Sequence, residues 1–170
     1  MNPVPASALA LVLLLAAPLA LAKSSDRNQP MDVESDAQSG IVTGDGTTVL
    51  TGNVVLTQGT LAINAARGEI IRSGGELSKA IFTGKQVKMK QQLDDGSWMD
   101  AAADRIEYDL LKETVTFIGN YTIKSPRGSN SGQRMVYNTT TGNMQSGGDG
   151  SRVRTVIQPK SAAPAPQGKN

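Results

Sequence analysis

Apolar and polar positions alternate with a period of two along most of the chain. Met31 and Val33 alternate with acidic residues, and Val87 and Met89 alternate with lysines. The same spacing recurs at Leu61, Ile63, Ile106, Tyr108 and Leu110. A period of two is typical of strands with one buried face. The alanines near residue 102 also allow a helix over 100–109, but the Ile-x-Tyr-x-Leu spacing there favours a strand. The pattern therefore predicts an all-β fold.

Short glycine-containing segments separate the alternating stretches. Each suits a tight turn, in which glycine supplies a positive φ or proline presets the bend. Turns are expected at residues 44–46, 73–75, 94–96, 126–128, 141–143 and 147–150. Many short strands joined by tight turns also fit a composition with 18 glycines and only two Phe, one Trp and three Tyr.

A Gly-Asn pair stands inside two strand-like runs, "VLTGNVVLTQ" at 49–58 and "TFIGNYTIKS" at 116–125. Such a pair is usually the loop of a two-residue hairpin. A hairpin would mix polar and apolar residues on one face, whereas an uninterrupted strand sorts them cleanly. We therefore expect Gly52 and Gly119 to be inward-facing positions within long strands, where the strand bends or another backbone comes close.

The surroundings of the two pairs are also alike, which indicates an internal repeat. Asp36 precedes the first pair and Asp104 the second, and an arginine follows each pair at Arg67 and Arg134. Residues ~34–72 and ~102–138 are thus one module present twice. Repeated units of short strands predict a β-jelly roll or a roll-like solenoid.

The two ends of the chain differ in composition from the rest. The apolar run "ALALVLLLAA" at 8–17 is followed by Ala-Leu-Ala at 20–22, although no Lys or Arg precedes it. This predicts a secretory signal peptide over 1–22, cleaved between Ala22 and Lys23, and hence an exported protein. The folded domain is expected over 23–157. The Pro- and Ala-rich tail over 158–170 is expected to be disordered.

The residue types exclude most enzyme classes. The chain has no His and no Cys, which removes His-based triads and ordinary zinc sites. Asp94 and Asp95 lie in a turn signal, and no glycine loop of the phosphate-binding type leads into a helix. A net charge of +2 is too small for a nucleic-acid-binding surface. The sequence therefore predicts no catalytic residue, metal, cofactor or nucleic acid.

Several motifs together resemble the OstA-like family of periplasmic lipopolysaccharide-transport proteins. They are "QPMDVESDAQSG", "VLTGNVVLTQGTLAINAARGEIIR", "GGELSKAIFTG", "ADRIEYDLLKETVTFIGNY" and "GQRMVYNTTTGNM". The resemblance covers about 28–157. The family's recurring Ala-Asp step is Ala-Ala at 65–66 and Gly-Gln at 132–133. The resemblance implies a slightly twisted β-jelly roll of antiparallel strands, open at both ends.

The resemblance also implies a function. A protein of this family bridges the inner and outer membranes in the periplasm and passes lipopolysaccharide, through its lipid A, from the LptBFGC complex to the LptDE complex. The implied partners are an LptC-like component at the N-terminal edge and an LptD-like component at the C-terminal edge, with head-to-tail stacking of copies. Met31 and Val33 begin the first strand and residues 153–157 form the last, so these segments are the expected docking edges.

The apolar faces of the strands are the expected lipid-binding surface. Few aromatics and flexible methionines suit a loosely filled interior that holds acyl chains. The candidate lining residues are Met31, Val33, Leu50, Val54, Leu56, Val87, Met89, Ile106, Tyr108, Leu110, Phe117, Tyr121 and Ile123. The alternative is a packed core in a ligand-free structural β-module.

Basic residues could meet the phosphates of such a lipid. The candidates are Lys79, Lys85, Lys88, Lys90, Arg67, Arg72, Arg127 and Arg134. For any single one of them, solubility and protection of strand edges is the favoured interpretation.

Overall fold

The computed structural model describes residues 23–148 and 150–159. This part of the chain holds one short 3-10 helix and ten strands. The elements are η1 (Ser24–Asn28), β1 (Met31–Glu34), β2 (Ala37–Gly40), β3 (Gly46–Gln58), β4 (Leu61–Ser73), β5 (Glu76–Gln92), β6 (Trp98–Asp109), β7 (Thr114–Ser125), β8 (Gly128–Asn138), β9 (Met144–Ser146) and β10 (Arg154–Ile157). The all-β prediction is confirmed, including the strand at 100–109. Within these residues no helix is long and apolar enough to cross a membrane.

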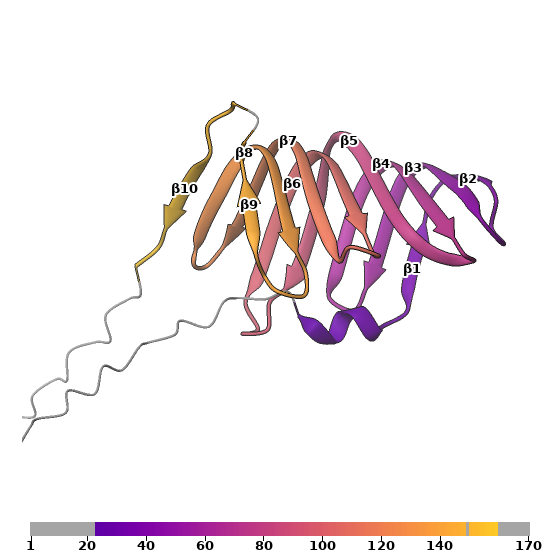
Figure 1. The fold of residues 1–170 in the computed structure, drawn as a ribbon, viewed down its shortest axis with the longest axis horizontal. Helices are drawn as coiled ribbons and strands as arrows, with labels where there is room; N and C mark the ends of the chain where they lie inside the picture. Colours follow the sequence, from indigo (N-terminus) through magenta and orange to yellow (C-terminus); the bar gives the residue numbers. More distant parts are fainter. Residues whose placement is uncertain (1–22, 149, 160–170) are drawn as a thin grey trace, which may run out of the picture.

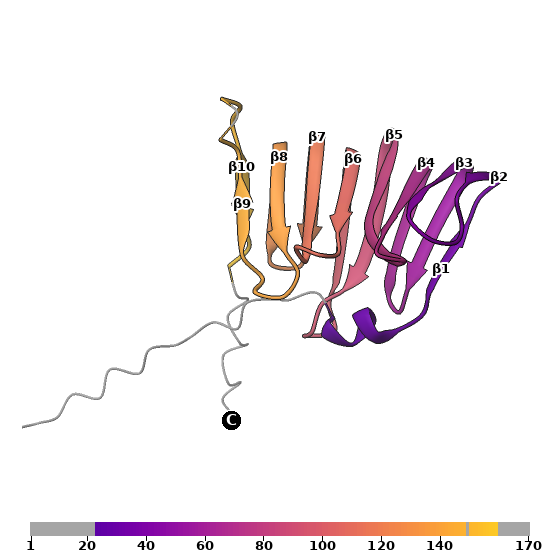
Figure 2. The same ribbon diagram turned by 45° about the vertical axis from the view of Figure 1, so that its right-hand side comes forward.

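All ten strands belong to one antiparallel sheet. The order is β1-β3-β4-β5-β6-β7-β8-β10, so neighbours in sequence are mostly neighbours in the sheet. β1 and β2 pair with successive parts of β3, and β10 and β9 pair with successive parts of β8. Figure 2 shows the strands following one another from β1 and β2 at one end to β9 and β10 at the other. The sheet does not close on itself, which confirms a roll open at both ends.

A line of irregularities crosses the sheet and bends it. Pairing shifts near the middle of every strand from β3 to β8. The shifts lie between Thr51 and Val54, Asn64 and Arg67, Thr83 and Val87, Ala102 and Arg105, and Ile118 and Tyr121. Bulges bend strands and increase their twist. Because the bulges align, the strands arch together and the sheet faces itself, as Figure 1 shows.

The bend divides the sheet into two halves that share one core. Half A contains β2 and β9, half B contains β1 and β10, and each of β3 to β8 contributes a segment to both halves. The buried cluster joins Phe82 and Phe117 of half A to Val54 and Tyr121 of half B. Burial of these side chains between the halves stabilises the roll, at about 25 cal/mol per Å² of apolar surface removed from water.

The Gly-Asn pairs lie inside continuous strands, as predicted, and mark the bend in β3 and β7. Gly52 and Gly119 both have a φ of 76° and the following asparagines are also left-handed. The prediction that these glycines face inward is wrong. A methyl group at Gly119 would meet the carboxylate of Asp104, not the core or another backbone, because two left-handed residues turn the position out of the pleat.

The internal repeat is also real in three dimensions. Asn53 donates its side-chain N–H to Asp36 Oδ2 at 2.9 Å, and Asn120 donates to Asp104 Oδ2 at 2.8 Å. A Cβ built at Gly52 would likewise meet the Asp36 carboxylate. Each glycine thus leaves room for the aspartate of a neighbouring segment, and each asparagine binds it. This contact explains why the same residue types occur twice.

One boundary differs from the sequence prediction, and two others lie wholly or mostly outside the described residues. Leu110 is not a strand residue, because β6 ends at Asp109 and Leu110 begins the turn to β7, where it is half-buried. The predicted signal peptide over 1–22 lies outside the described residues. So does the predicted tail, apart from Gln158, whose backbone N–H donates to the Arg127 carbonyl at 2.9 Å, and Pro159.

Candidate functional site

An apolar pocket of about 350 Å³ lies between the two halves of the sheet. It opens where the strand ends of half A and half B face each other, a line here called the seam. Its walls come from β5, β6 and β7 of half B and from β7, β8 and β9 of half A. The lining residues are Met89, Gln91, Leu93, Met99, Val115, Phe117, Ile123, Ser125, Met135, Tyr137, Thr139, Gly142, Asn143 and Met144. The pocket is suited to a flexible apolar ligand.

Methionine is concentrated in this pocket. Met89, Met99, Met135 and Met144 all line it, among six methionines in the whole sequence. Met89 and Met135 are buried, whereas the side chain of Met144 is 54% exposed at the edge strand β9. Methionine side chains are unbranched and polarizable, so they adapt to ligands of variable shape. The lining therefore fits hydrocarbon chains better than a rigid, hydrogen-bonding substrate.

A second, smaller pocket extends the same interior toward the N-terminal end. It shares Met89, Gln91, Val115 and Thr139 with the first pocket and is also lined by Ile106 and Tyr108. Here Lys23 and Asp26 of the N-terminal segment form part of the lining. The interior is thus covered by η1 over part of the seam. Figure 1 shows η1 lying along the lower side of the roll, next to the strand ends.

Buried polar contacts hold η1 in this position. The Asp26 carboxylate is 4% exposed and accepts hydrogen bonds from the Thr60 hydroxyl at 2.5 Å and from the Gln91 side-chain amide at 3.3 Å. The backbone N–H of Lys23 donates to the Gln92 carbonyl at 3.0 Å. A buried carboxylate needs such partners because its desolvation is costly. These bonds fasten the start of the described chain to β5 and to the turn after β3.

The structure brings together some of the sequence-predicted lining residues but not all of them. Five of the thirteen line one or both pockets, namely Met89, Ile106, Tyr108, Phe117 and Ile123. Leu50, Val54, Leu56, Val87 and Tyr121 are buried in the tightly packed cluster. Met31 and Val33 are half-buried on β1 and pack against that cluster. Leu110 lines neither pocket and is not part of the buried cluster.

Sequence reasoning missed eleven of the fourteen residues that line the larger pocket. Met99, Met135, Tyr137 and Met144 line it but were not candidates, and neither was Phe82, which is fully buried nearby in the cluster. In β5 and β6 the alternation changes phase at the bend, and this hides Phe82 and Met99. In β5, Ala80 and Phe82 face inward before the bend and Val87 and Met89 after it. The three consecutive apolar residues Ala80, Ile81 and Phe82, which break the alternation, were the available signal in the sequence.

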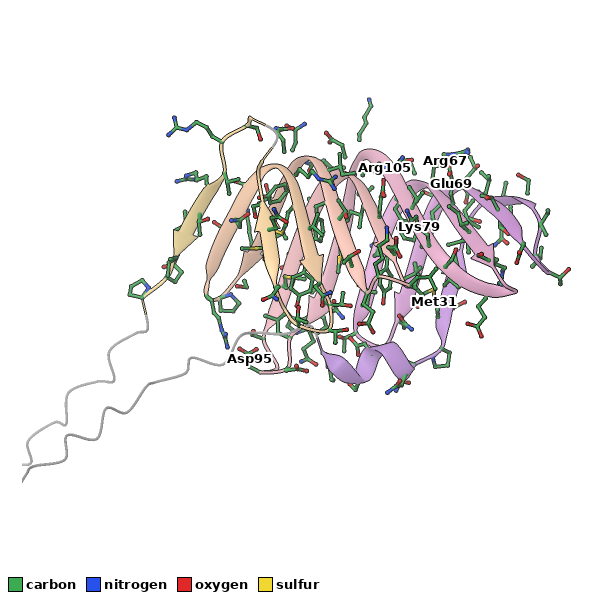
Figure 3. All side chains as sticks on the ribbon, viewed as in Figure 1. Met31, Arg67, Glu69, Lys79, Asp95 and Arg105 are labelled. Atoms are coloured by element: carbon green, nitrogen blue, oxygen red, sulfur yellow. The ribbon has the colours of Figure 1, made fainter. Side chains whose placement is uncertain are left out.

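Across the described part of the chain, three of the eight basic candidates, Arg67, Lys79 and Arg127, form an ion pair with an acidic residue. Arg67 pairs with Glu69 at 3.3 Å, Lys79 with Asp109 at 3.8 Å, and Arg127 with Asp95 at 2.6 Å. Arg105, which was not a candidate, pairs with Glu107 at 2.6 Å. Figure 3 shows Arg67, Glu69 and Arg105 near the upper side of the roll, opposite the side on which Asp95 lies. Exposed pairs of this kind contribute little to stability. They support the interpretation that these cations keep the surface soluble.

Asp95 is held in a well-defined turn before β6. It accepts hydrogen bonds from the Ser97 hydroxyl at 2.6 Å and the Ser97 backbone N–H at 3.0 Å, and Arg127 donates to it at 2.6 Å. These bonds, the Ser97 hydroxyl first among them, lower the pKa of Asp95 from its ordinary value. The turn links the β5–β6 connection to the β7–β8 connection and has no catalytic partner.

The C-terminal edge strand is joined to the core by a chain of hydrogen bonds. The Tyr121 hydroxyl donates to Asn130 Oδ1 at 2.5 Å, and Asn130 Nδ2 donates to the Thr155 hydroxyl at 2.8 Å. Tyr121 and Asn130 are buried, and Thr155 lies on β10. β10 pairs with β8 on one side only, so its other side is an open strand edge. β1 presents an open edge at the opposite end of the sheet.

Comparison with known proteins gives consistent matches. The profile of the family described as "LptA/(LptD N-terminal domain) LPS transport protein" matches residues 32–143. The lipopolysaccharide export system protein LptA of Escherichia coli K12 is 36% identical over 154 residues, covering 89% of this chain and 83% of that protein. LptA of Haemophilus influenzae is 33% identical over 151 residues, covering 86% and 87%.

A solved structure shares the fold. The crystal structure of LptH from Pseudomonas aeruginosa, described as the LptA-homologous periplasmic component of the lipopolysaccharide transport device, matches with a TM-score of 0.70. The match covers 79% of this chain and 99% of that chain, at 24% sequence identity. At this identity, the likeness shows the jelly-roll architecture alone.

Proposed function

The chain belongs to the LptA/(LptD N-terminal domain) family of LPS transport proteins, and from this premise we propose that it carries lipopolysaccharide across the periplasm. The acyl chains of the lipid lie in the apolar interior, and the sugar chain remains outside the seam. The protein is a transport component and not an enzyme. The single observation that supports this function best is the methionine-lined pocket, which is apolar and opens at the seam.

The energetics suit a carrier that receives and releases its cargo. Each methylene group that leaves water contributes about 0.8 kcal/mol, so partial enclosure of several acyl chains holds the lipid firmly. Release then requires a second apolar surface that receives the chains as they leave. A roll open at both ends supplies such a surface when another roll abuts it.

The open edges suggest how the neighbouring rolls abut. Edge strands normally invite pairing with other chains, and β-augmentation uses this for recognition. In the proposed bridge, β1 pairs with an LptC-like inner-membrane component or with another copy, and β10 pairs with an LptD-like outer-membrane component. Copies stack head to tail, and such a heterologous contact need not close into a ring. Lipid then passes from the LptBFGC complex toward the LptDE complex for outer-membrane assembly.

A ligand-free structural module is the competing interpretation, and crosslinking separates the two. A photoreactive residue at Met89, which lines both pockets, should form adducts with lipopolysaccharide in living cells. Tyr108 is a second test position in the smaller pocket. The exposed neighbour Lys88 is the matched control. Adducts at Met89 and Tyr108 but not at Lys88 would support the carrier, whereas a folded protein without adducts at either interior position would refute it.

Docking through β1 has its own test. Replacing Val33 by proline removes a backbone donor from the edge strand, which proteins tolerate at sheet edges. We expect the variant to fold but to lose head-to-tail assembly in analytical ultracentrifugation. Asp32→Ala changes a side chain on the same strand without removing a donor, so it should assemble normally. Assembly of Val33→Pro at the wild-type level would contradict docking at this edge.

A further inference from the structure

Arg72 differs from the other basic residues in the face of the sheet that it occupies. It lies near the end of β4 in half A, opposite Gly46 of β3. Two and four residues earlier on the same strand, Ile70 packs against the core and Gly68 is buried. Pairing with β3 is regular over this stretch, and the shift between Ile71 and Arg72 in the pairing with β5 places its extra residue, Ser78, on β5. The period of two along β4 therefore places Arg72 on the same inner face. Arg67, beyond Gly68, lies on the outer face.

Arg72 also lacks the acidic partner that Arg67 has. Its Nε is shielded from solvent, yet it has no hydrogen-bond partner. Among the residues that the structure describes, no carboxylate forms an ion pair with the Arg72 guanidinium. A shielded N–H group without a partner costs free energy, so such groups are rare in native proteins. Arg72 shares the inner face with Ile70 and with the buried Thr48 opposite Ile70, neither of which carries a charge, so its guanidinium calls for an anionic ligand.

The chemistry of the guanidinium indicates the class of that ligand. Its planar array of N–H donors matches the oxygens of a phosphate. The positions paired with Arg72 carry Gly46 on one side and Leu77 on the other, so neither supplies an anion. A setting shielded from water strengthens the attraction of the guanidinium for an anion that enters it. The ligand should carry negative charge next to hydrocarbon.

We propose that Arg72 binds a phosphate group on the headgroup of the lipid that the protein carries, while the acyl chains lie in the apolar interior. The guanidinium N–H groups, Nε among them, donate hydrogen bonds to the phosphate oxygens. This inference rests on the proposed function and deepens it, because it makes the interior selective for an anionic lipid. The other basic candidates of the sequence are not required for this contact.

Binding of two lipids by the purified protein tests the inference. The probes are lipid A with both phosphates and the same lipid A after removal of both phosphates, each presented in mild detergent. The wild-type protein should bind the phosphorylated form at least tenfold more tightly. Arg72→Gln should weaken binding of the phosphorylated form about tenfold and leave binding of the dephosphorylated form unchanged, since it removes a charged hydrogen bond. Arg72→Lys should restore part of the loss.

The matched control is Arg67→Gln on the same strand. Arg67 faces outward and pairs with Glu69, so this variant should bind both lipids as the wild type does. Equal losses for both lipids in Arg72→Gln would mean that Arg72 acts only through packing, and no loss would mean that it does not touch the lipid. Either result overturns the inference. Circular dichroism of each variant confirms that it folds.

Two further arms use the wild-type protein alone. Equal affinity for both lipids would overturn the role of Arg72 even if Arg72→Gln failed to fold. Inorganic phosphate should compete weakly, and only at millimolar concentration. Competition at micromolar concentration would identify a site for free phosphate and overturn its assignment to a lipid headgroup. If the wild type bound neither lipid, the proposed function itself would fail, which is a different result from loss of phosphate selectivity.

Discussion

Substitution of Gly119 by alanine tests the account of the bend in the sheet. Gly119 has a φ of 76°, and a methyl group there would lie 2.5 Å from Asp104 Oδ2. The same Asp104 oxygen accepts the hydrogen bond from Asn120 at 2.8 Å. Alanine therefore meets two obstacles at once, a backbone conformation that side chains disfavour and a carboxylate in the space that its methyl group needs.

The two obstacles set the expected magnitude. The left-handed conformation costs an alanine about 1–2 kcal/mol. Displacement of the Asp104 side chain breaks its hydrogen bond with Asn120, which is worth about 1 kcal/mol at a partly exposed position. Gly119→Ala should thus lower the free energy of unfolding by about 2–3 kcal/mol, a large share of the ~5–15 kcal/mol that is typical of a domain.

Urea unfolding measures the effect. Trp98 is the only tryptophan in the chain and lies at the start of β6, so its fluorescence reports on the sheet together with far-UV circular dichroism. The midpoint should fall with an unchanged slope. In the double variant Gly119→Ala/Asp104→Ala the steric part disappears, and the loss caused by Gly119→Ala should shrink to about 1–2 kcal/mol. A loss below about 0.5 kcal/mol in the single variant would refute the reasoning.

The repeat provides a matched comparison at Gly52. This glycine has the same φ and faces Asp36 in the same way, but Asp36 lies in the short connection between β1 and β2 at the sheet edge. That connection can move with little effect on the core, whereas Asp104 lies within β6 in the middle of the sheet. Gly52→Ala should therefore destabilise the protein less than Gly119→Ala, and the opposite order would contradict this explanation.

Three other perturbations test separate parts of the structure. Phe117→Ala removes a side chain that is 2% exposed and should lower the free energy of unfolding, measured in urea titrations, by about 3–5 kcal/mol. A loss under about 1 kcal/mol would mean that the two halves of the sheet do not pack against each other through Phe117. Asp26→Ala removes the hydrogen-bond partner of Thr60 and Gln91, so the backbone amides of η1 should lose protection in hydrogen exchange while those of the central strands keep theirs. Unchanged protection of η1 would contradict its attachment through Asp26. The folded state lowers the pKa of Asp95, so the stability difference between wild type and Asp95→Asn should be present above pH 3.8 and vanish as the pH falls through the lower folded pKa. A difference in the free energy of unfolding that persisted in strong acid would refute the ionic origin.

Local patterns in the sequence determined most of the secondary structure. The alternation at Val87 and Met89, and the sorting of polar from apolar residues around Gly52, required strands, because the pleat places neighbouring residues on opposite faces. Turn positions followed from glycine and proline for equally local reasons. The absence of His and Cys likewise narrowed the chemistry without any knowledge of the fold.

Only the tertiary structure decided which side chains share the interior. The bulge in β5 reverses the facing of the residues after it, so the facing of Phe82 and of Val87 cannot follow from one continuous alternation. The location of each bulge depends on pairing with a neighbouring strand, as at Thr83 and Val87 of β5 opposite β6. Strand pairing joins residues that are far apart in the sequence. Three features therefore arise only when the whole sheet forms: the bend of the sheet, the methionine-lined pocket at the seam, and the unpaired Arg72 on the inner face.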